Sequence, residues 1–219
     1  RKCAMSFQKI DLQTYARRKH FEYFCSLQYP YVGVTQEVDV TEMAQYCKTR
    51  RWSFYLAFLH AAALAADGVR EFRQRIHNGG IVEYDECPTS HIELLENDTY
   101  CYCTLRHHMP MEEYIPYALA AREACRRGGS IEEDEAVESM YFISTLPWLH
   151  YSALIQPVAG AEESNPRITW GKYQEGSDGR KTLPVTVLAH HALVDGIHIA
   201  KFYQNLERQM RQIIAGEAK

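Results

Sequence analysis

The segment 183–214 constrains the fold more than any other part of the chain. Its first part, 183–189, reads L-P-V-T-V-L-A and is short, apolar and β-branched, which is typical of a buried strand. Its last part carries apolar side chains at steps of three and four, which predicts a helix with one buried face. Between them lie His190, His191 and Asp195-Gly196. The sequence therefore predicts a strand that ends at paired histidines and leads into a helix, with Asp195 near its start.

A histidine at the end of a buried strand is a candidate general base, because its unperturbed pKa lies near neutral pH. A lone histidine in such a place is more often a core residue whose ring nitrogens are hydrogen-bonded. Here the double histidine, the Asp-Gly turn and the strand-to-helix context occur together. This combination favours the catalytic interpretation.

The composition limits the classes of protein that this chain can represent. With 219 residues, 46% of them apolar and 24% charged, it predicts one globular domain over residues 1–219. A formal net charge of −4 argues against a nucleic-acid-binding protein, which would carry a basic face. No segment has the roughly 20 apolar residues of a membrane span. Seven scattered cysteines predict free thiols in a reducing compartment, so the cytoplasm is the expected location.

Strand and helix patterns are intermixed along the chain. Helices are expected over 14–27 with Thr14 as the cap, from Thr41 onward, over 53–66 and over 111–126. Strands are expected over 7–11, 31–40, 81–84, 91–95, 99–105, 141–146 and 152–158, with a hairpin joining 167–174 to 182–189 and a solvated acidic loop at 132–135. This order predicts an α/β (α+β) fold, a two-layer sandwich with a mixed sheet and helices on one face.

Three motifs resemble the signatures of one enzyme family. Residues 190–199 read H-H-A-L-V-D-G-I-H-I and follow G-K-Y-Q at 171–174; S-T-L-P-W stands at 144–148, and R-R-K-H-F-E at 17–22. Their order and spacing resemble those of the trimeric chloramphenicol acetyltransferases. The resemblance implies the CoA-dependent acyltransferase fold and transfer of acetyl from acetyl-CoA to a hydroxyl group, with chloramphenicol as the leading acceptor.

The resemblance also implies a role for each matching residue. His191 would be the general base, Ser144 the donor to the oxyanion, and Thr169 an assistant through a water molecule. Arg17 would pair with Asp195 and hold the turn that aims His191. Burying such a pair is costly unless both charges are hydrogen-bonded. Removal of one partner should therefore destabilise the fold by more than the pair stabilises it.

The substrate sites follow from the same resemblance. The family's CoA-binding positions fall on Tyr55, Trp148, Lys172 and Tyr173. Ser53 stands where the family usually has a lysine, so either Arg50 or Arg51 replaces it or CoA binds more weakly. The acceptor pocket would be lined by Phe24, Val32, Tyr100, Tyr102 and Gln156. Val32, Tyr102 and Gln156 depart from the family pattern, and Phe142 replaces a usual asparagine. A homotrimer is implied, with each base delivered into a neighbour's acceptor pocket.

Several alternatives remain open from the sequence. The same fold could acylate another acceptor, or bind a small molecule without catalysis. A hydrolase would use Ser144, His191 and Asp195 as a triad, although no Gly-x-Ser-x-Gly motif surrounds the serine. The acyltransferase core of a 2-oxoacid dehydrogenase complex carries a similar His-x-x-x-Asp-Gly motif. A metal site could form from Cys101, Cys103, His107 and His108, but packing cysteines are commoner, and no metal is expected.

Overall fold

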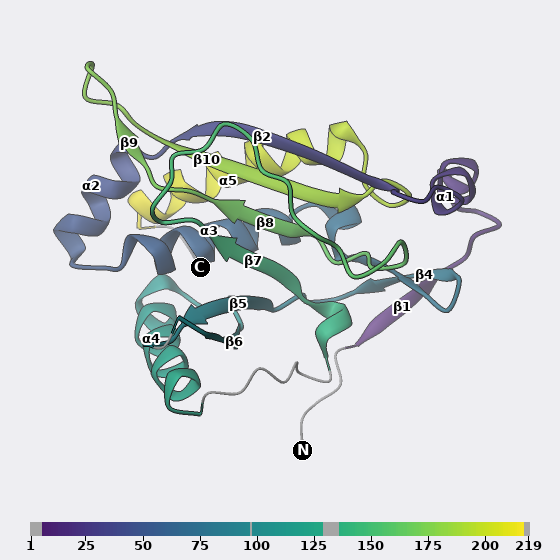
Figure 1. Cartoon of the computed structure of the whole chain (residues 1–219), viewed down its shortest axis with the longest axis horizontal. Coiled ribbons are helices and arrows are strands. Elements are labelled where there is room, and N and C mark those ends of the chain that lie inside the picture. Colours follow the sequence, from purple (N-terminus) through teal and green to yellow (C-terminus); the bar gives the residue numbers. More distant parts are fainter. Residues whose placement is uncertain (1–5, 97, 129–135, 217–219) are drawn as a thin grey trace.

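The computed structural model of the chain describes residues 6–96, 98–128 and 136–216. At its centre is a mixed seven-stranded sheet (Figure 1). The strands in spatial order are β2 (Tyr31–Asp39), β10 (Lys181–His190), β8 (Arg167–Trp170), β7 (Tyr141–Thr145), β5 (Thr89–Leu94) and β6 (Tyr100–Leu105), and β9 (Gln174–Glu175) pairs with the start of β10. Strand β7 is parallel to β5 and β8, whereas the other pairs are antiparallel, which confirms the predicted mixed sheet.

A second, smaller sheet lies beside the first one. It has the antiparallel order β1 (Phe7–Ile10), β4 (Gly80–Tyr84) and β3 (Gln74–His77). The turn between β3 and β4 contains Asn78 and Gly79 with φ of 51° and 75°, values that these two residue types tolerate. The sequence Asn78-Gly79-Gly80 therefore suits this turn.

The helices pack mainly on one face of the large sheet (Figure 1). These are α2 (Thr41–Arg50), α3 (Phe54–Asp67) and α5 (Gly196–Ile214); α4 (Met111–Gly128) packs against β5 and β6, and α1 (Arg18–Cys25) lies beyond the end of β10. Single-turn helices form at η1 (Arg70–Arg73) and η2 (Val137–Ser139). None of the helices in the described residues combines the length and apolar character that a membrane crossing requires.

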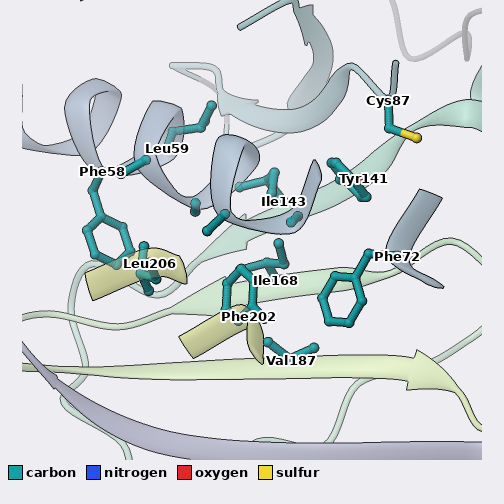
Figure 2. Close-up of a cluster of buried hydrophobic side chains, with 14 of the residues drawn as sticks. Phe58, Leu59, Phe72, Cys87, Tyr141, Ile143, Ile168, Val187, Phe202 and Leu206 are labelled. Atoms are coloured by element: carbon teal, nitrogen blue, oxygen red, sulfur yellow. The ribbon is translucent and has the colours of Figure 1, made fainter. Parts of the chain in front are cut away.

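The core lies between this helical layer and the sheet (Figure 2). Helix α3 is buried on nearly all sides because its sequence, F-Y-L-A-F-L-H-A-A-A-L-A-A-D, places small alanines where neighbouring elements approach. Helix α5 buries one stripe, which includes Phe202 and Leu206. These side chains meet Ile143, Ile168 and Val187, which point from β7, β8 and β10 toward the helices. Alternate residues of the same strands must therefore point to the opposite face.

The predicted strand over 152–158 is wrong. This segment forms no regular strand and belongs to a loop, coloured green in Figure 1, that passes over the sheet face opposite the helices. Both edges of β8 are already paired, with β7 and with β10. The segment therefore cannot pair with β8, the next strand along the chain, and crosses the sheet face instead.

The predicted start of the first helix is also wrong. The helix begins at Arg18 with Arg17 as its N-cap, and no side chain caps it. Thr14 lies in a preceding turn, where the Asp11 carboxylate accepts hydrogen bonds from the Gln13 N–H at 2.9 Å and the Thr14 hydroxyl at 3.3 Å. An aspartate that bonds the backbone two residues ahead favours a turn over a helix. The predicted acidic loop at 132–135 lies outside the described residues.

Candidate functional site

His191 follows directly after β10 and is held on three sides. Its backbone N–H donates to the Pro30 carbonyl at 2.7 Å, and its ring stacks on Phe24 at 3.8 Å between centroids with 14° between planes. Its Nδ1 lies 3.0 Å from the Val194 carbonyl oxygen. A carbonyl can only accept, so Nδ1 carries the proton in the neutral ring and Nε2 keeps its lone pair. The sequence alone left this tautomer open, and it is the form that a general base requires.

His190 is satisfied at both ring nitrogens. Its Nε2 lies 2.8 Å from the Ala161 carbonyl oxygen, and its Nδ1 accepts from the Ala192 N–H at 3.2 Å. The side chain is buried, and burial lowers the pKa of His190 below its usual value. These contacts indicate a structural role for the first histidine of the pair.

The turn after His191 is held mainly through its backbone carbonyls. The Arg17 guanidinium donates to the Leu193 carbonyl oxygen and, at 3.4 Å, to that of His191. Its ion pair with Asp195 spans 3.7 Å, and the carboxylate side chain is 47% exposed. The predicted pair is therefore present but not buried, so the expected penalty for a buried unpaired charge does not apply.

Asp195 acts mainly at the start of α5. Its carboxylate accepts from the Gly196 N–H at 2.8 Å, and its own N–H donates to Nδ1 of His198 at 2.9 Å. The first of these hydrogen bonds is the main reason that the pKa of Asp195 lies below its usual value. The predicted N-cap is thereby confirmed.

Ser144 and Thr169 belong to a row of hydroxyl side chains across the sheet. Strand register places Ser144 opposite Thr169, Thr169 opposite Thr186, and Thr186 opposite Thr35. Ile143, Ile168 and Val187, the neighbours of three of these residues along their strands, point toward the helices. The hydroxyl row therefore points to the opposite face of the sheet. The Ser144 hydroxyl has no hydrogen-bond partner in the described part of the chain, so it can donate to a bound group. Thr169 donates to Gln156 Oε1 at 3.3 Å.

A cavity of about 500 Å³ opens beside this row, between the sheet face and the loop that crosses it. Of the predicted catalytic and acceptor residues, Ser144, Tyr102 and Gln156 line it together. Sequence reasoning missed several other lining residues, because they are brought in by strand pairing and by the loop. These are Ser90, Ile92, Val137, Ile143, Pro157, Ala159, Glu163, Asn165 and Arg167, and Phe142, noted only as a substitution, also lines it.

His191 and Ser144 do not meet within one chain. Ser144 is level with Thr186 through Thr169, and His191 lies five residues further along β10 and two strands away. A rise of about 3.3 Å per residue and a strand spacing of about 4.8 Å place their Cα atoms roughly 19 Å apart. Ser144, His191 and Asp195 therefore do not form a triad within the chain. A hydrolase site in one chain would need these three side chains in contact, so the structure does not support it.

The other predicted acceptor residues lie apart from the cavity lining. Phe24 stacks on His191 at the end of β10. Val32 is opposite Ala189 in the β2–β10 pairing and packs against the core. Tyr100 is 43% exposed and contacts the Tyr102 ring at 5.6 Å between centroids. One chain thus carries two separate groups of predicted residues, one around His191 and one around Ser144.

Three of the predicted CoA-binding residues lie on adjacent exposed segments. The Lys172 N–H donates to the Leu149 carbonyl oxygen at 2.7 Å, which joins the segment after β8 to the loop that bears Trp148. Trp148 and Tyr173 are 69% and 40% exposed, and Lys172 is also exposed. Gly171 is required here, because a Cβ at this position would lie 2.4 Å from the Leu149 carbonyl oxygen.

Tyr55 is directed into the protein instead. Its ring contacts Trp170 at 5.7 Å between centroids and lies beneath the Arg122 guanidinium at 5.0 Å. Near the missing lysine, Arg50 pairs with Glu112 at 3.2 Å, whereas Arg51 is exposed and forms no ion pair in the described part of the chain. Of the two arginines, Arg51 is the one that is free to contact a phosphate.

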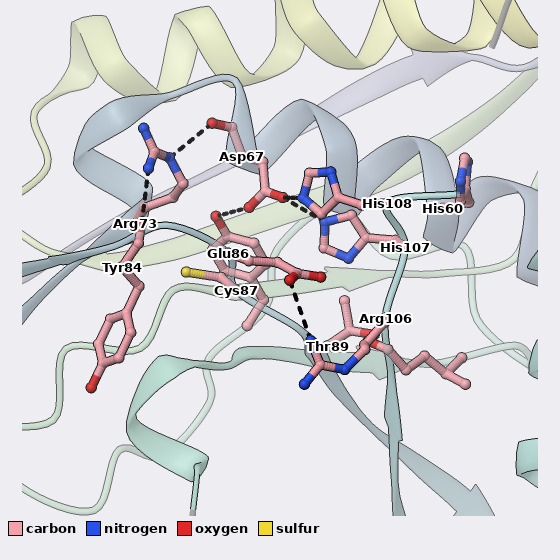
Figure 3. Close-up of polar contacts among 12 residues, drawn as sticks. His60, Asp67, Arg73, Tyr84, Glu86, Cys87, Thr89, Arg106, His107 and His108 are labelled. Carbon is pink, nitrogen blue, oxygen red and sulfur yellow. Dashed lines mark hydrogen bonds and ion pairs between the residues drawn. The ribbon is translucent and has the colours of Figure 1, made fainter. Parts of the chain in front are cut away.

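The four residues of the alternative metal site do not converge. Cys101 and Cys103 are buried in β6, and the six cysteines in the described residues are free thiols. His107 and His108 instead both direct Nε2 at the same carboxylate oxygen of Asp67, at 2.6 Å (Figure 3). These three residues could together hold a cation by the spacing of their ligand atoms.

Both oxygens of the Asp67 carboxylate already accept hydrogen bonds. Its second oxygen accepts from the Tyr141 hydroxyl at 2.8 Å. Burial alone would raise the pKa of Asp67, but the hydrogen bonds from His107 and His108 outweigh it and lower this pKa to about 2. The cluster ties the end of α3 to β7, which is a structural role.

Comparisons with known proteins show the family to which the chain is similar. The family model described as chloramphenicol acetyltransferase matches residues 5–207. Chloramphenicol acetyltransferase 3 of Escherichia coli is 25% identical over 206 residues, which cover 93% of this chain and 96% of that protein. Chloramphenicol acetyltransferase 2 of Escherichia coli is 25% identical over 213 residues, 96% of this chain and 100% of that protein.

Solved structures show the same fold. A chloramphenicol acetyltransferase superposes with a TM-score of 0.84 at 24% identity and covers 94% of this chain and 100% of the other. The dihydrolipoamide acetyltransferase of Azotobacter vinelandii superposes with a TM-score of 0.67 at 17% identity, over 90% of this chain and 88% of the other. The predicted CoA-dependent acyltransferase fold is therefore confirmed.

Proposed function

Because the chain belongs to the chloramphenicol acetyltransferase family, we propose that this acyltransferase moves an acetyl group from acetyl-CoA to a hydroxyl of a small molecule, with chloramphenicol as the leading acceptor. The observation that carries the proposal is the His191 ring, whose Nδ1 lies 3.0 Å from the Val194 carbonyl oxygen, so that Nε2 is free to accept a proton. In this proposal residues 1–219 act as one domain. The protein works in the cytoplasm, a location that the free cysteines favour.

The site is completed by a second copy of the chain in a homotrimer. Two observations support this proposal. His191 and Ser144 are roughly 19 Å apart in one chain by strand geometry, too far for a shared reaction. The described residues that line the cavity beside Ser144 also include no histidine, so the imidazole base must come from another place.

The reaction then follows from the two halves. Nε2 of His191 from one copy takes the proton of the acceptor hydroxyl as its oxygen attacks the thioester carbon. The Ser144 hydroxyl of the neighbouring copy donates to the oxyanion that forms, a contact worth about 2.7–4 kcal/mol in the transition state. Collapse of the tetrahedral intermediate breaks the carbon–sulfur bond. The departing thiolate takes the proton back from His191.

Thr169 and Phe24 position these groups. The Thr169 hydroxyl lies in the same row as Ser144 and holds Gln156, which keeps that wall of the cavity in place. Phe24 stacks against the flat face of the His191 imidazole and limits its rotation. A base held in one orientation loses less entropy on reaching the transition state.

The residues on the exposed rim fit a nucleotide thioester. Trp148 and Tyr173 offer exposed rings for stacking on the adenine or for contact with the pantetheine arm. Lys172, and Arg51 in place of the absent lysine, supply cations for the phosphates. Tyr55 is expected to contribute only by supporting the adjoining wall, since its ring is packed inside.

Release of free CoA thiol in the presence of acetyl-CoA and chloramphenicol tests the reaction. The wild-type protein should release thiol only when the acceptor is present. His191→Ala should abolish this release, whereas Lys19→Ala, on the exposed side of α1, should leave it unchanged. Thiol release that survives the His191→Ala change would refute the assignment of the base.

Co-expression of two inactive variants tests the shared site. Alone, His191→Ala should be inactive and Ser144→Ala should keep about 1% of the wild-type activity or less. In a mixed trimer, one of the three interfaces joins an intact His191 to an intact Ser144. Random assembly at equal amounts should therefore restore about a quarter of the wild-type activity. No restoration in purified mixed trimers would show that the site is not shared between copies.

A further inference from the structure

Three side chains with metal-binding atoms converge at the end of α3 (Figure 3). The Nε2 atoms of His107 and His108 both lie 2.6 Å from the same carboxylate oxygen of Asp67. The three ligand atoms lie within 4.8 Å of one another. Two imidazole nitrogens and one carboxylate oxygen form a ligand set that is typical of zinc and related divalent ions.

The ligand atoms are held close together by the fold. Asp67 is the last residue of α3, and His107 and His108 come two and three residues after the end of β6. The two imidazole rings are tilted by 34°, with their centroids 4.7 Å apart, and both direct a nitrogen at the carboxylate. Because the ligands are already gathered, an ion would lose less binding free energy in ordering them.

The carboxylate is oriented to offer one oxygen. Its other oxygen accepts from the Tyr141 hydroxyl at 2.8 Å, and Tyr141 is fully buried. Carboxylates that bind metal ions are usually held by such outer hydrogen bonds. Asp67 can therefore contact an ion through one oxygen while Tyr141 prevents the carboxylate from turning.

The two arginines labelled beside the cluster in Figure 3 are occupied by other acids. The Arg73 guanidinium pairs with Glu83 at 3.4 Å, and that of Arg106 pairs with Glu86 at 3.3 Å. The Asp67 carboxylate forms ion-pair contacts only with the two histidines in the described part of the chain. With neutral imidazoles, its negative charge is left for a cation to compensate.

The ligand atoms can be reached from solvent through His108. Its side chain is 48% exposed, whereas those of Asp67 and His107 are 9% and 0% exposed. Rotation of the exposed ring away from the carboxylate admits an ion, and its return encloses the ion. A tetrahedral ion at about 2.0–2.2 Å from each atom holds its ligand atoms roughly 3.3–3.5 Å apart. The two distances of 2.6 Å therefore need to lengthen by less than about 1 Å.

From these contacts we propose that Asp67, His107 and His108 bind one divalent transition-metal ion, such as zinc, with solvent as the fourth ligand. Each neutral imidazole then carries its proton on Nδ1, so that the Nε2 lone pair faces the ion. Nδ1 of His107 is buried without a partner in the described residues, whether or not it carries the proton. The ion ties the end of α3 to the segment after β6 and does not belong to the cavity beside Ser144, which none of the three ligands lines.

Calorimetric titration of the tag-free, chelator-treated protein with zinc alone tests the site. One zinc ion per chain should bind with a Kd on the order of 1 μM or lower. Magnesium should not bind measurably, because it prefers sets of oxygen ligands. Zinc at about 100 times its Kd should also raise the melting temperature by about 5–10 °C.

Two ligand variants and one control assign the binding to this cluster. His108→Ala removes a ligand at a half-exposed position, where truncation leaves the core intact, and should weaken zinc binding by about 100-fold or more. Asp67→Asn should weaken it similarly, and both variants should lose most of the rise in melting temperature. His20→Ala, which removes an exposed histidine of α1, should bind zinc like the wild type.

Cobalt(II) in place of zinc separates this site from a cysteine site, since the chain has seven cysteines. Nitrogen and oxygen ligands give bound cobalt only weak visible bands, whereas thiolate ligands add an intense near-ultraviolet band. The wild type should show the first spectrum, and His108→Ala should lose it. Absence of zinc binding, binding that His108→Ala leaves intact, or a thiolate band from the bound ion would each overturn the proposal.

Discussion

Removal of the Arg17 guanidinium should damage the site more than removal of the Asp195 charge. Arg17→Met keeps most of the aliphatic stem and deletes the donors to the Leu193 and His191 carbonyls. Asp195→Asn deletes the negative charge, and asparagine is as good an N-cap as aspartate. The two variants therefore separate the ion pair from the carbonyl contacts.

The magnitudes follow from the contacts. The ion pair spans 3.7 Å to a carboxylate that is 47% exposed, so it contributes about 1 kcal/mol or less. A hydrogen bond from a charged donor contributes about 1.5–3 kcal/mol, so losing two should cost about 3 kcal/mol or more. The turn also carries the His191 imidazole, and a displacement of about 1 Å at a catalytic group can lower the rate about 100-fold.

Urea unfolding and acetyl-transfer rates would measure both effects. Arg17→Met should lower the free energy of unfolding by about 3 kcal/mol and kcat by about 10- to 100-fold, with Asp195→Asn within about 1 kcal/mol and threefold of wild type. The double variant should resemble Arg17→Met, with a coupling free energy of about 1 kcal/mol or less. If Asp195→Asn alone matched Arg17→Met, the ion pair would be holding the turn and the reasoning would be refuted.

Three further predictions concern other parts of the structure. Ser144→Ala should lower kcat by about 100- to 1,000-fold in the thiol-release assay. The melting temperature should stay the same, because the hydroxyl has no partner among the described residues. A drop in both kcat and melting temperature would indicate a structural serine. Gly171→Ala should lower the free energy of unfolding by about 1–3 kcal/mol, because the new Cβ would lie 2.4 Å from the Leu149 carbonyl oxygen. Gly128→Ala is the control: its Cβ meets nothing within 4 Å, so its free energy of unfolding should stay unchanged. Because folding lowers the pKa of Asp67 from 3.8 to about 2, the charged carboxylate stabilises the fold at pH values above 3.8, and this stabilisation is lost as the pH falls through about 2. Asp67→Asn should therefore be about 2 kcal/mol less stable at neutral pH and should lose less stability on acidification. Parallel acid-unfolding curves for the wild type and the variant would contradict this.

Much of the fold could be predicted because local sequence patterns record which face of an element is buried. The short, apolar, β-branched segment 183–189 and the apolar stripe after Gly196 specified β10 and α5, and the turn between them placed His191 at the end of a strand. The error at 152–158 has a nonlocal cause. Strand β8, the next strand along the chain, pairs with β7 and with β10 on its two sides, and those pairings depend on residues distant in the sequence.

The candidate site was likewise predictable only in part. Sequence motifs predicted Ser144, Thr169 and His191 as candidate site residues, because these positions stand in recognisable local contexts. Tertiary structure alone decided that Ser144 and His191 lie far apart in one chain, and that His107 and His108 meet the Asp67 carboxylate. The physical reason is that strand register and loop placement depend on contacts between residues distant in sequence, whereas the period of side chains along one strand or helix depends only on its own backbone.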